Sequence, residues 1–124
     1  MIISTGIDII EVARIREALK RTARFVDRVF TPDERAYCDS RGGAAQHYAA
    51  RFAAKEAALK ALGTGWSGGI SWHDVEVMSR ENGAPYLVLS GGALEVFHRL
   101  TGRHLHLSMS HTNEHAIAQV IIER

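Results

Sequence analysis

The chain has 124 residues, of which 46% are hydrophobic and 23% are charged, and its formal net charge is +1. These values are typical of one soluble globular domain and exclude a disordered chain, and the near-neutral charge does not favour a nucleic-acid binder. The one cysteine cannot form an internal disulfide, no apolar run could span a membrane, and residues 1–10 lack the basic start of a signal peptide. We therefore expect a single domain over residues 1–124, located in the cytoplasm, with neither nucleic-acid nor membrane partners.

The first element is a run rich in β-branched residues, Ile2–Ile10, which predicts a largely buried strand. With a period of two, Gly6 and Asp8 share one face, and Gly6 would let another group approach the backbone closely. Aspartate is depleted in strands and is rarely buried without a partner. Asp8 therefore either caps a helix that starts near Glu11 or has a functional role.

Residues 11–28 follow an amphipathic pattern that predicts a helix with a break near Thr22. This segment carries twice as many cations as acids, although the whole chain is nearly neutral. The cations are Arg14, Arg16, Lys20, Arg21, Arg24 and Arg28. Such an asymmetry suggests a docking face for an acidic partner, which could be a protein or a phosphate backbone. A capping box at Thr31-Pro32-Asp33-Glu34 then predicts the start of a short helix.

The central stretch predicts a long helix from about Gln46 to Leu62, closed by Gly63, because it is rich in helix formers and lacks proline. Phe52 and Glu56 lie in line with apolar residues on one face of this helix. A carboxylate on an apolar stripe is costly unless a cation, proton or metal meets it. Glu56 either pairs with Lys60, one turn further on, or is met by another cation, a proton or a metal.

The second half predicts mainly β structure. Asn82-Gly83 favours a hairpin between strands at 72–80 and 86–90, a helix follows over 93–100, and strands at 104–110 and 116–122 form a second hairpin. The glycine-rich segment 63–69 is a weak phosphate-binding signal, because it follows a helix and does not precede one. Ser110-His111-Thr112 could bind phosphate or relay a proton, or could simply be hairpin residues.

Together these residues resemble the holo-acyl-carrier-protein synthase family of 4′-phosphopantetheinyl transferases, in its short bacterial form. The resemblance covers essentially the whole chain. It rests on these motifs: Gly6-Ile7-Asp8-Ile9, Phe30-Thr31 with Glu34, Arg51-Phe52-Ala53-Ala54-Lys55-Glu56-Ala57, Lys60-Ala61, Gly63-Thr64-Gly65 and Ser110-His111-Thr112. It implies an α+β fold in which an antiparallel sheet packs against a long central helix. It also implies a homotrimer with active sites between subunits.

The same resemblance implies a metal site in which Asp8 and Glu56 bind Mg²⁺. Two carboxylates suffice for this ion, since waters and substrate phosphates complete its coordination. The residues implied to hold or lie near coenzyme A are Arg51, Lys55, Lys60, Gly63, Thr64, Gly65, Ser110, His111 and Thr112. Those implied to dock the carrier protein are Arg14, Arg21 and Arg24.

The implied reaction moves 4′-phosphopantetheine from coenzyme A to a serine of apo acyl carrier protein and releases adenosine 3′,5′-bisphosphate. This is a step of lipid metabolism in fatty acid biosynthesis, although a polyketide carrier fits equally well. Lys60 could stabilise the departing phosphate. A metal-bound water, Glu56 and His111 all stay open as the base. Two rival classes are a binding module for RNA or an acidic protein, and a two-carboxylate metal nuclease.

Overall fold

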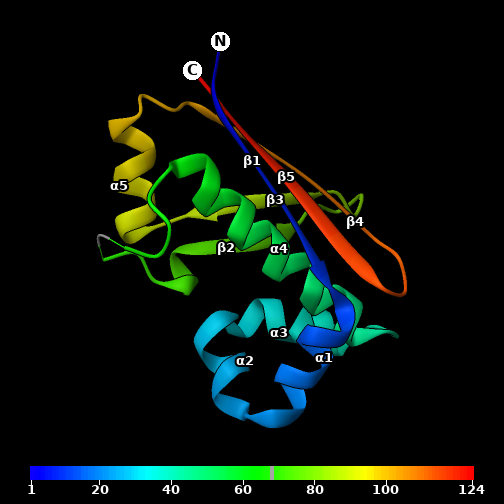
Figure 1. Cartoon of the computed structure of the whole chain (residues 1–124). Helices are drawn as coiled ribbons and strands as arrows, with labels where there is room; N and C mark the ends of the chain where they lie inside the picture. Colours follow the sequence, from blue (N-terminus) through cyan, green and yellow to red (C-terminus); the bar gives the residue numbers. More distant parts are fainter. Residues whose placement is uncertain (68) are drawn as a thin grey trace.

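A computed structural model describes residues 1–67 and 69–124, so Gly68 of the glycine-rich segment lies outside the description. The chain contains both helices and strands, and its fold is of the α+β class (Figure 1). The elements are β1 (Ile2–Glu11), α1 (Val12–Arg21), α2 (Ala23–Val29), α3 (Pro32–Asp39), α4 (Ala44–Leu62), the 3₁₀ turn η1 (Trp72–Asp74), β2 (Val75–Ser79), β3 (Pro85–Leu89), α5 (Gly91–Arg99), β4 (His104–His111) and β5 (His115–Glu123). None of the described helices is long and apolar enough to cross a membrane.

The strands of the described residues form two antiparallel sheets. In the larger sheet the order is β1-β5-β4, so that the first and last strands of the chain are neighbours. Both ends of the chain consequently lie close together (Figure 1), and the backbone N–H of Arg124 donates to the carbonyl of Met1. The smaller sheet is the β2–β3 hairpin, which the Asn-Gly signal predicted.

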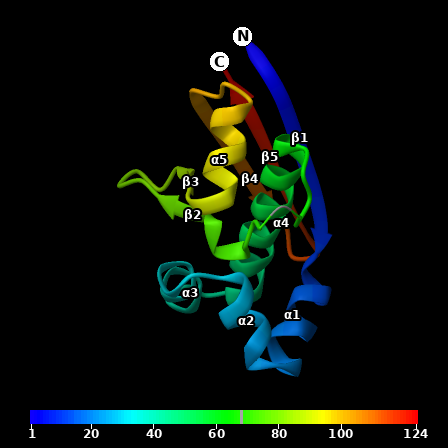
Figure 2. The same cartoon turned by 90° about the vertical axis from the view of Figure 1, so that its left-hand side faces the viewer.

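Helix α4 is the centre of the molecule. It lies between the three-stranded sheet on one side and α5 with the β2–β3 hairpin on the other (Figure 2). Its contact with β1 is very close, because a Cβ atom on Gly6 would lie only 1.9 Å from the carbonyl oxygen of Ala57. This explains why glycine stands in the middle of a strand. The expected antiparallel sheet against a long central helix is confirmed.

Two local predictions differ in their outcome. The helix break at Thr22 is confirmed, since α1 ends there and the Thr22 hydroxyl accepts the N–H of Arg24 as the cap of α2. A strand over the whole of 72–80 is wrong. Residues 72–74 form a 3₁₀ turn because the Asp74 carboxylate accepts the backbone N–H of Ser71 and closes the chain locally.

The larger sheet has two unlike faces. Alternate residues of β5 (Ala116, Ala118 and Val120) are buried against α4. The opposite face carries exposed apolar side chains, with Ile7 55% exposed, Ile9 63% and Ile117 38%. A strand that buries one face normally places polar residues on the other. The outer face of this sheet is therefore unusually apolar.

Candidate active site

A cavity of about 330 Å³ opens between β1, α1, α2 and the middle of α4. Asp8 from β1 and Glu56 from α4 both line it, together with Arg14 of α1, Phe25 of α2 and Phe52 of α4. The structure thus brings to one place the two carboxylates that the sequence singled out. A small hollow with apolar walls and a few converging polar groups is the usual setting of a binding site.

Asp8 is on the face of β1 that turns toward α4, and its side chain is 17% exposed. Its Oδ1 lies 3.1 Å from Nζ of Lys60, which also donates to the carbonyl of Ile7 at 2.9 Å. The reading of Asp8 as a helix cap is wrong, because α1 begins after Glu11 without any side-chain cap. Asp8 is instead a partly buried carboxylate with one cationic partner.

Glu56 is half-buried on α4. Its Oε1 accepts a hydrogen bond of 3.2 Å from the indole Nε1 of Trp66, in the loop after the helix. The local pairing of Glu56 with Lys60 is wrong, since Lys60 points to Asp8. Trp66 was missed from the sequence, where the only signal was an aromatic residue inside a glycine-rich loop.

The donor set of this cavity suits Mg²⁺. The ion prefers oxygen ligands and is commonly bound through one or two carboxylates, with waters and substrate phosphates completing six positions. The residues described contain no cluster of three or more potential ligand side chains, which a site built entirely by the protein would need. Asp8 and Glu56 would therefore hold the ion together with its substrate.

The loop after α4 begins with a helix cap. Gly63 ends α4 with a φ of +79°, as predicted, and its N–H donates to the carbonyls of Leu59 and Lys60. Thr64 makes contacts inside the loop, with its hydroxyl 3.0 Å from the carbonyl of Gly65. Gly63 and Gly65 are exposed and the Lys60 side chain is 55% exposed, so all three are open to a ligand.

Lys55 lies in the core and does not reach the cavity. Its ammonium contacts Oε1 of Glu34 at 2.8 Å and donates to the carbonyls of Trp72 and Val75, at 3.0 and 2.6 Å. Both side chains of the ion pair are 0% exposed. Burial lowers the pKa of Lys55, although Glu34 opposes this effect. The three N–H groups of Lys55 already have partners in the core, which argues against the prediction that Lys55 contacts a coenzyme A phosphate.

Arg51 and His111 belong to a second cluster, beside the N-terminal half of α4. The guanidinium of Arg51, 2% exposed, stacks at 3.9 Å on the ring of Tyr37, and Arg41 stacks on the same ring at 4.3 Å. His47 bridges this stack to His111, with ring centroids 5.9 Å from Tyr37 and 5.4 Å from His111. Burial and these cations lower the pKa of His47. The cluster is rich in positive charge.

His111 lines a separate cavity of about 200 Å³ with Ser110 and Thr112. The Thr112 hydroxyl accepts the backbone N–H groups of Glu114 and His115, so it stabilises the β4–β5 turn. Ile9 lines both this cavity and the one with Asp8 and Glu56. Within one chain the structure therefore does not bring His111 to the carboxylates.

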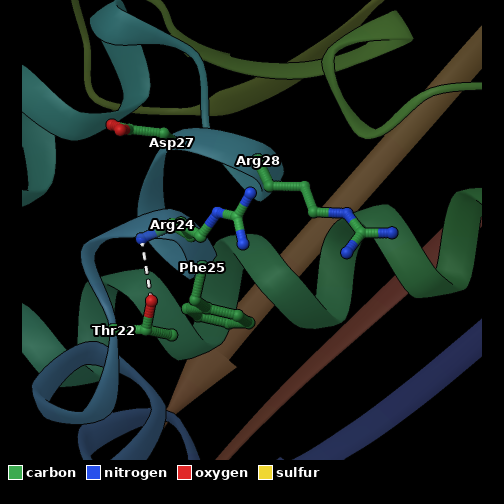
Figure 3. A pocket seen from close by; sticks show the side chains of 5 residues that line it. All are labelled: Thr22, Arg24, Phe25, Asp27 and Arg28. Atoms are coloured by element: carbon green, nitrogen blue, oxygen red, sulfur yellow. Dashed lines mark hydrogen bonds between the residues drawn. The ribbon is translucent and has the colours of Figure 1, made fainter.

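The three arginines predicted to dock a partner are exposed, and one of them, Arg14, lines the carboxylate cavity. Arg14 lines that cavity and also a groove along α1, in which Arg21 takes part. Arg24 lines a wide hollow of about 850 Å³ beside α2, where the side chains of Arg24 and Arg28 extend past Phe25 (Figure 3). The basic surface thus continues from both helices to the edge of the carboxylate cavity.

Comparison with known proteins agrees with this arrangement. Residues 4–120 match the sequence profile of the 4′-phosphopantetheinyl transferase superfamily. The chain belongs to this superfamily. A holo-[acyl-carrier-protein] synthase of Koribacter versatilis is 52% identical over 124 residues, which cover 99% of each chain. A synthase of the same name from Geobacter sp. is 48% identical over 100% of both chains. Within the superfamily, the chain is an enzyme of the holo-[acyl-carrier-protein] synthase type.

Solved structures share the fold. The holo-[acyl-carrier-protein] synthase of Neisseria meningitidis matches with a TM-score of 0.89 at 31% identity, over 100% of both chains. The Bacillus anthracis synthase, in complex with CoA (3′,5′-ADP), has a TM-score of 0.82 at 39% identity, over 98% of this chain and 96% of that one. The Helicobacter pylori synthase, in complex with coenzyme A, has a TM-score of 0.84 at 32% identity, over 96% and 99%.

Proposed function

We propose that this chain transfers 4′-phosphopantetheine from coenzyme A to a serine of apo acyl carrier protein, with Mg²⁺ bound by Asp8 and Glu56, and releases adenosine 3′,5′-bisphosphate. The observation that carries the proposal is the single cavity lined by both carboxylates, with Lys60 beside it. The relatives named holo-[acyl-carrier-protein] synthase and the two complexes with coenzyme A support it.

In this reaction the serine oxygen attacks the phosphorus that carries pantetheine. The bond from that phosphorus to the bridging oxygen of the pyrophosphate breaks, and adenosine 3′,5′-bisphosphate leaves with the electron pair. Bound at the carboxylates, Mg²⁺ would offset the negative charge of the pyrophosphate. Lys60 has a largely exposed side chain, so its ammonium can turn from Asp8 to the departing phosphate and stabilise it.

The serine proton must pass to a base. Of the two candidate side chains, Glu56 lines the carboxylate cavity and His111 lines the neighbouring one. A base has to lie within hydrogen-bond reach of the proton that it accepts. This placement brings Glu56 closer than His111 to the reacting serine inside one subunit, but it does not choose the base, because Mg²⁺ and the Trp66 N–H engage the same carboxylate. It leaves the exposed members of the second cluster, His111 and Arg41, available for the 3′-phosphate of coenzyme A, whereas Arg51 is buried beside them.

The carrier protein would dock on α1 and α2 through Arg14, Arg21 and Arg24. Arg14 is the link between binding and chemistry, because it lines both the α1 groove and the carboxylate cavity. An acidic helix lying along these arginines would bring its serine to the rim of that cavity. Charge complementarity of this kind accelerates encounter and fixes register. We place the reaction in the cytoplasm, as predicted from the sequence.

We further propose that the enzyme is a homotrimer, with the outer face of the larger sheet as the interface. Ile7, Ile9 and Ile117 are exposed on that face in the single chain, and apolar patches of this kind commonly mark interfaces. Ile9 also lines both cavities, so a neighbouring subunit would complete their walls. Ile9→Glu is expected to give monomers in light scattering. A trimer in this variant would exclude the face as the interface.

The test of the proposed function is the intact mass of an apo acyl carrier protein after incubation with this protein, coenzyme A and Mg²⁺, with and without a chelator. Carriers of fatty acid and polyketide synthesis would be compared in parallel. We expect a gain of one phosphopantetheine that the chelator prevents. A gain that survives the chelator would refute the metal part alone. No gain with any carrier would refute the transfer and favour a module that only binds.

A further inference from the structure

Glu56 has an unusual partner for a carboxylate in such a cavity. The partner is the indole N–H of Trp66, which donates to Oε1 across 3.2 Å from ten residues further along the chain. Both side chains are half-buried. In the part of the chain that the structure describes, Oε2 of Glu56 accepts no hydrogen bond. One oxygen is therefore engaged and the other is free.

The indole is held in place by an aromatic stack. The ring of Trp66 lies on that of Trp72, with centroids 3.6 Å apart, and Trp72 stacks on Phe52 at 5.3 Å. Phe52 precedes Glu56 by one turn of α4 and lines the same cavity. In the loop, the Ser67 hydroxyl donates to the carbonyl of Thr64 at 2.6 Å. The donor consequently has a fixed position relative to the helix that carries its acceptor.

We propose that Trp66 is a positioning residue for Glu56: its N–H holds Oε1, so that Oε2 is the oxygen presented to a divalent cation. This inference rests on the proposed function, in which Glu56 is a ligand of Mg²⁺. A free glutamate rotates about its terminal torsion and can turn both oxygens away from the ion. An outer hydrogen bond removes that freedom and orients the ligand.

The test compares Trp66→Phe with Trp72→Phe. The first variant keeps an aromatic ring on Trp72 but removes the donor, and the second makes the same chemical change in the other ring and leaves the donor intact. We expect Trp66→Phe to raise the Mg²⁺ concentration for half-maximal transfer by about 10-fold, while the rate at saturating Mg²⁺ changes by about twofold or less. Trp72→Phe keeps an aromatic ring between Phe52 and Trp66 and leaves the donor, so its Mg²⁺ requirement should stay within about twofold of that of the unchanged protein.

A second readout needs no turnover. The chain contains two tryptophans, so Trp66 is the only one left in Trp72→Phe. A cation that binds Glu56 changes the field at the indole N–H, and its fluorescence should respond to Mg²⁺ over the range that supports transfer. Adding Glu56→Gln to this variant should abolish the response. This measurement still decides the matter if Trp66→Phe does not fold.

Two results would overturn the inference. One is that Trp66→Phe and Trp72→Phe require the same concentration of Mg²⁺ for half-maximal transfer. The other is that the fluorescence of Trp66 does not change when Mg²⁺ is added. If the unchanged protein requires Mg²⁺ and either result is found, the proposed function stands and only the role of Trp66 falls. If the unchanged protein transfers phosphopantetheine in the presence of chelator, both the metal site and this role of Trp66 are refuted.

Discussion

Two lysines of helix α4, five positions apart, have opposite surroundings. Lys55 is 0% exposed and pairs with an equally buried Glu34, whereas Lys60 is 55% exposed and pairs with Asp8 at the rim of a cavity. Glu34 also accepts the backbone N–H groups of Thr31 and Val77. The Lys55–Glu34 pair thus joins α3, α4 and β2, and the Lys60–Asp8 pair joins α4 to β1.

The difference teaches that the two charges have different tasks. A buried ion pair with all its hydrogen bonds made is costly to break, because the remaining charge is left in the core without a partner and without solvation by water. An exposed pair contributes little to stability and can exchange its partner for a ligand. Of these two lysines of one helix, Lys55 stabilises the fold, and Lys60 is exposed and open to a ligand.

The largest effect is expected from Lys55→Met, which should lower the free energy of unfolding by about 3–5 kcal/mol. Glu34 would keep two backbone N–H partners but would lose its cation in the core. Urea unfolding followed by circular dichroism measures the change. Lys60→Met is the matched control: it should cost at most about 1 kcal/mol and should slow transfer. Equal losses of stability in the two variants would contradict the comparison.

Glu56→Gln should reduce transfer by at least about 100-fold and leave the unfolding curve unchanged, because the amide is a poor ligand for Mg²⁺ but still accepts the Trp66 hydrogen bond. Carrier mass at a series of times gives the rate. This variant extends the comparison of the two lysines, because Glu56 is next to Lys55 in the sequence but its replacement should lower the transfer rate and not the stability. Near-normal turnover would remove Glu56 from the metal site.

A smaller effect is expected when Arg14 and Arg21 are both changed to Glu. The KM for the carrier should rise by about 10-fold, while the KM for coenzyme A should change less than twofold, because exposed charges at a rim mainly govern encounter. Reversal of Arg16 and Lys20 makes the same change of charge on the same helix and serves as the control. An equal loss for both substrates would refute the docking role of Arg14 and Arg21.

Local signals account for what the sequence predicted well. The capping box of Thr31 and Glu34, the C-cap at Gly63 and the break at Thr22 all depend on atoms a few residues apart, and all are present. The β4–β5 hairpin likewise follows from alternation and a short turn. Burial arguments singled out Asp8 and Glu56, which the structure brings into one cavity, and the family resemblance added their predicted role as Mg²⁺ ligands.

The misses are pairings between distant segments. Lys60 finds its partner 52 residues away, and Glu34 serves as cap, ion-pair partner and acceptor for a strand at once. Spacing on a helix cannot tell which of Lys55 and Lys60 turns inward, because that depends on which elements pack against each side of α4. The contact of Trp66 with Glu56 is equally invisible, since it needs the folded loop.

The smallest effect is expected at His47 of α4. Its exposure lies between that of the buried Lys55 and that of the exposed Lys60, and its neighbours are Arg41, Arg51 and His111. Burial first, and then these neighbours, hold the pKa of His47 below its usual 6.5 in the folded chain. Below about pH 6.5 the unfolded chain therefore binds more protons at His47 than the folded chain does. The free energy of unfolding should have its full value above that pH and should decline below it.

His47→Gln should flatten this decline in urea unfolding between about pH 7.5 and 5.5. Curves that stay parallel would show that the pKa of His47 is not lowered in the folded chain. Because adding coenzyme A would bring negative charge to the cluster, it should also flatten the decline if its phosphate binds there.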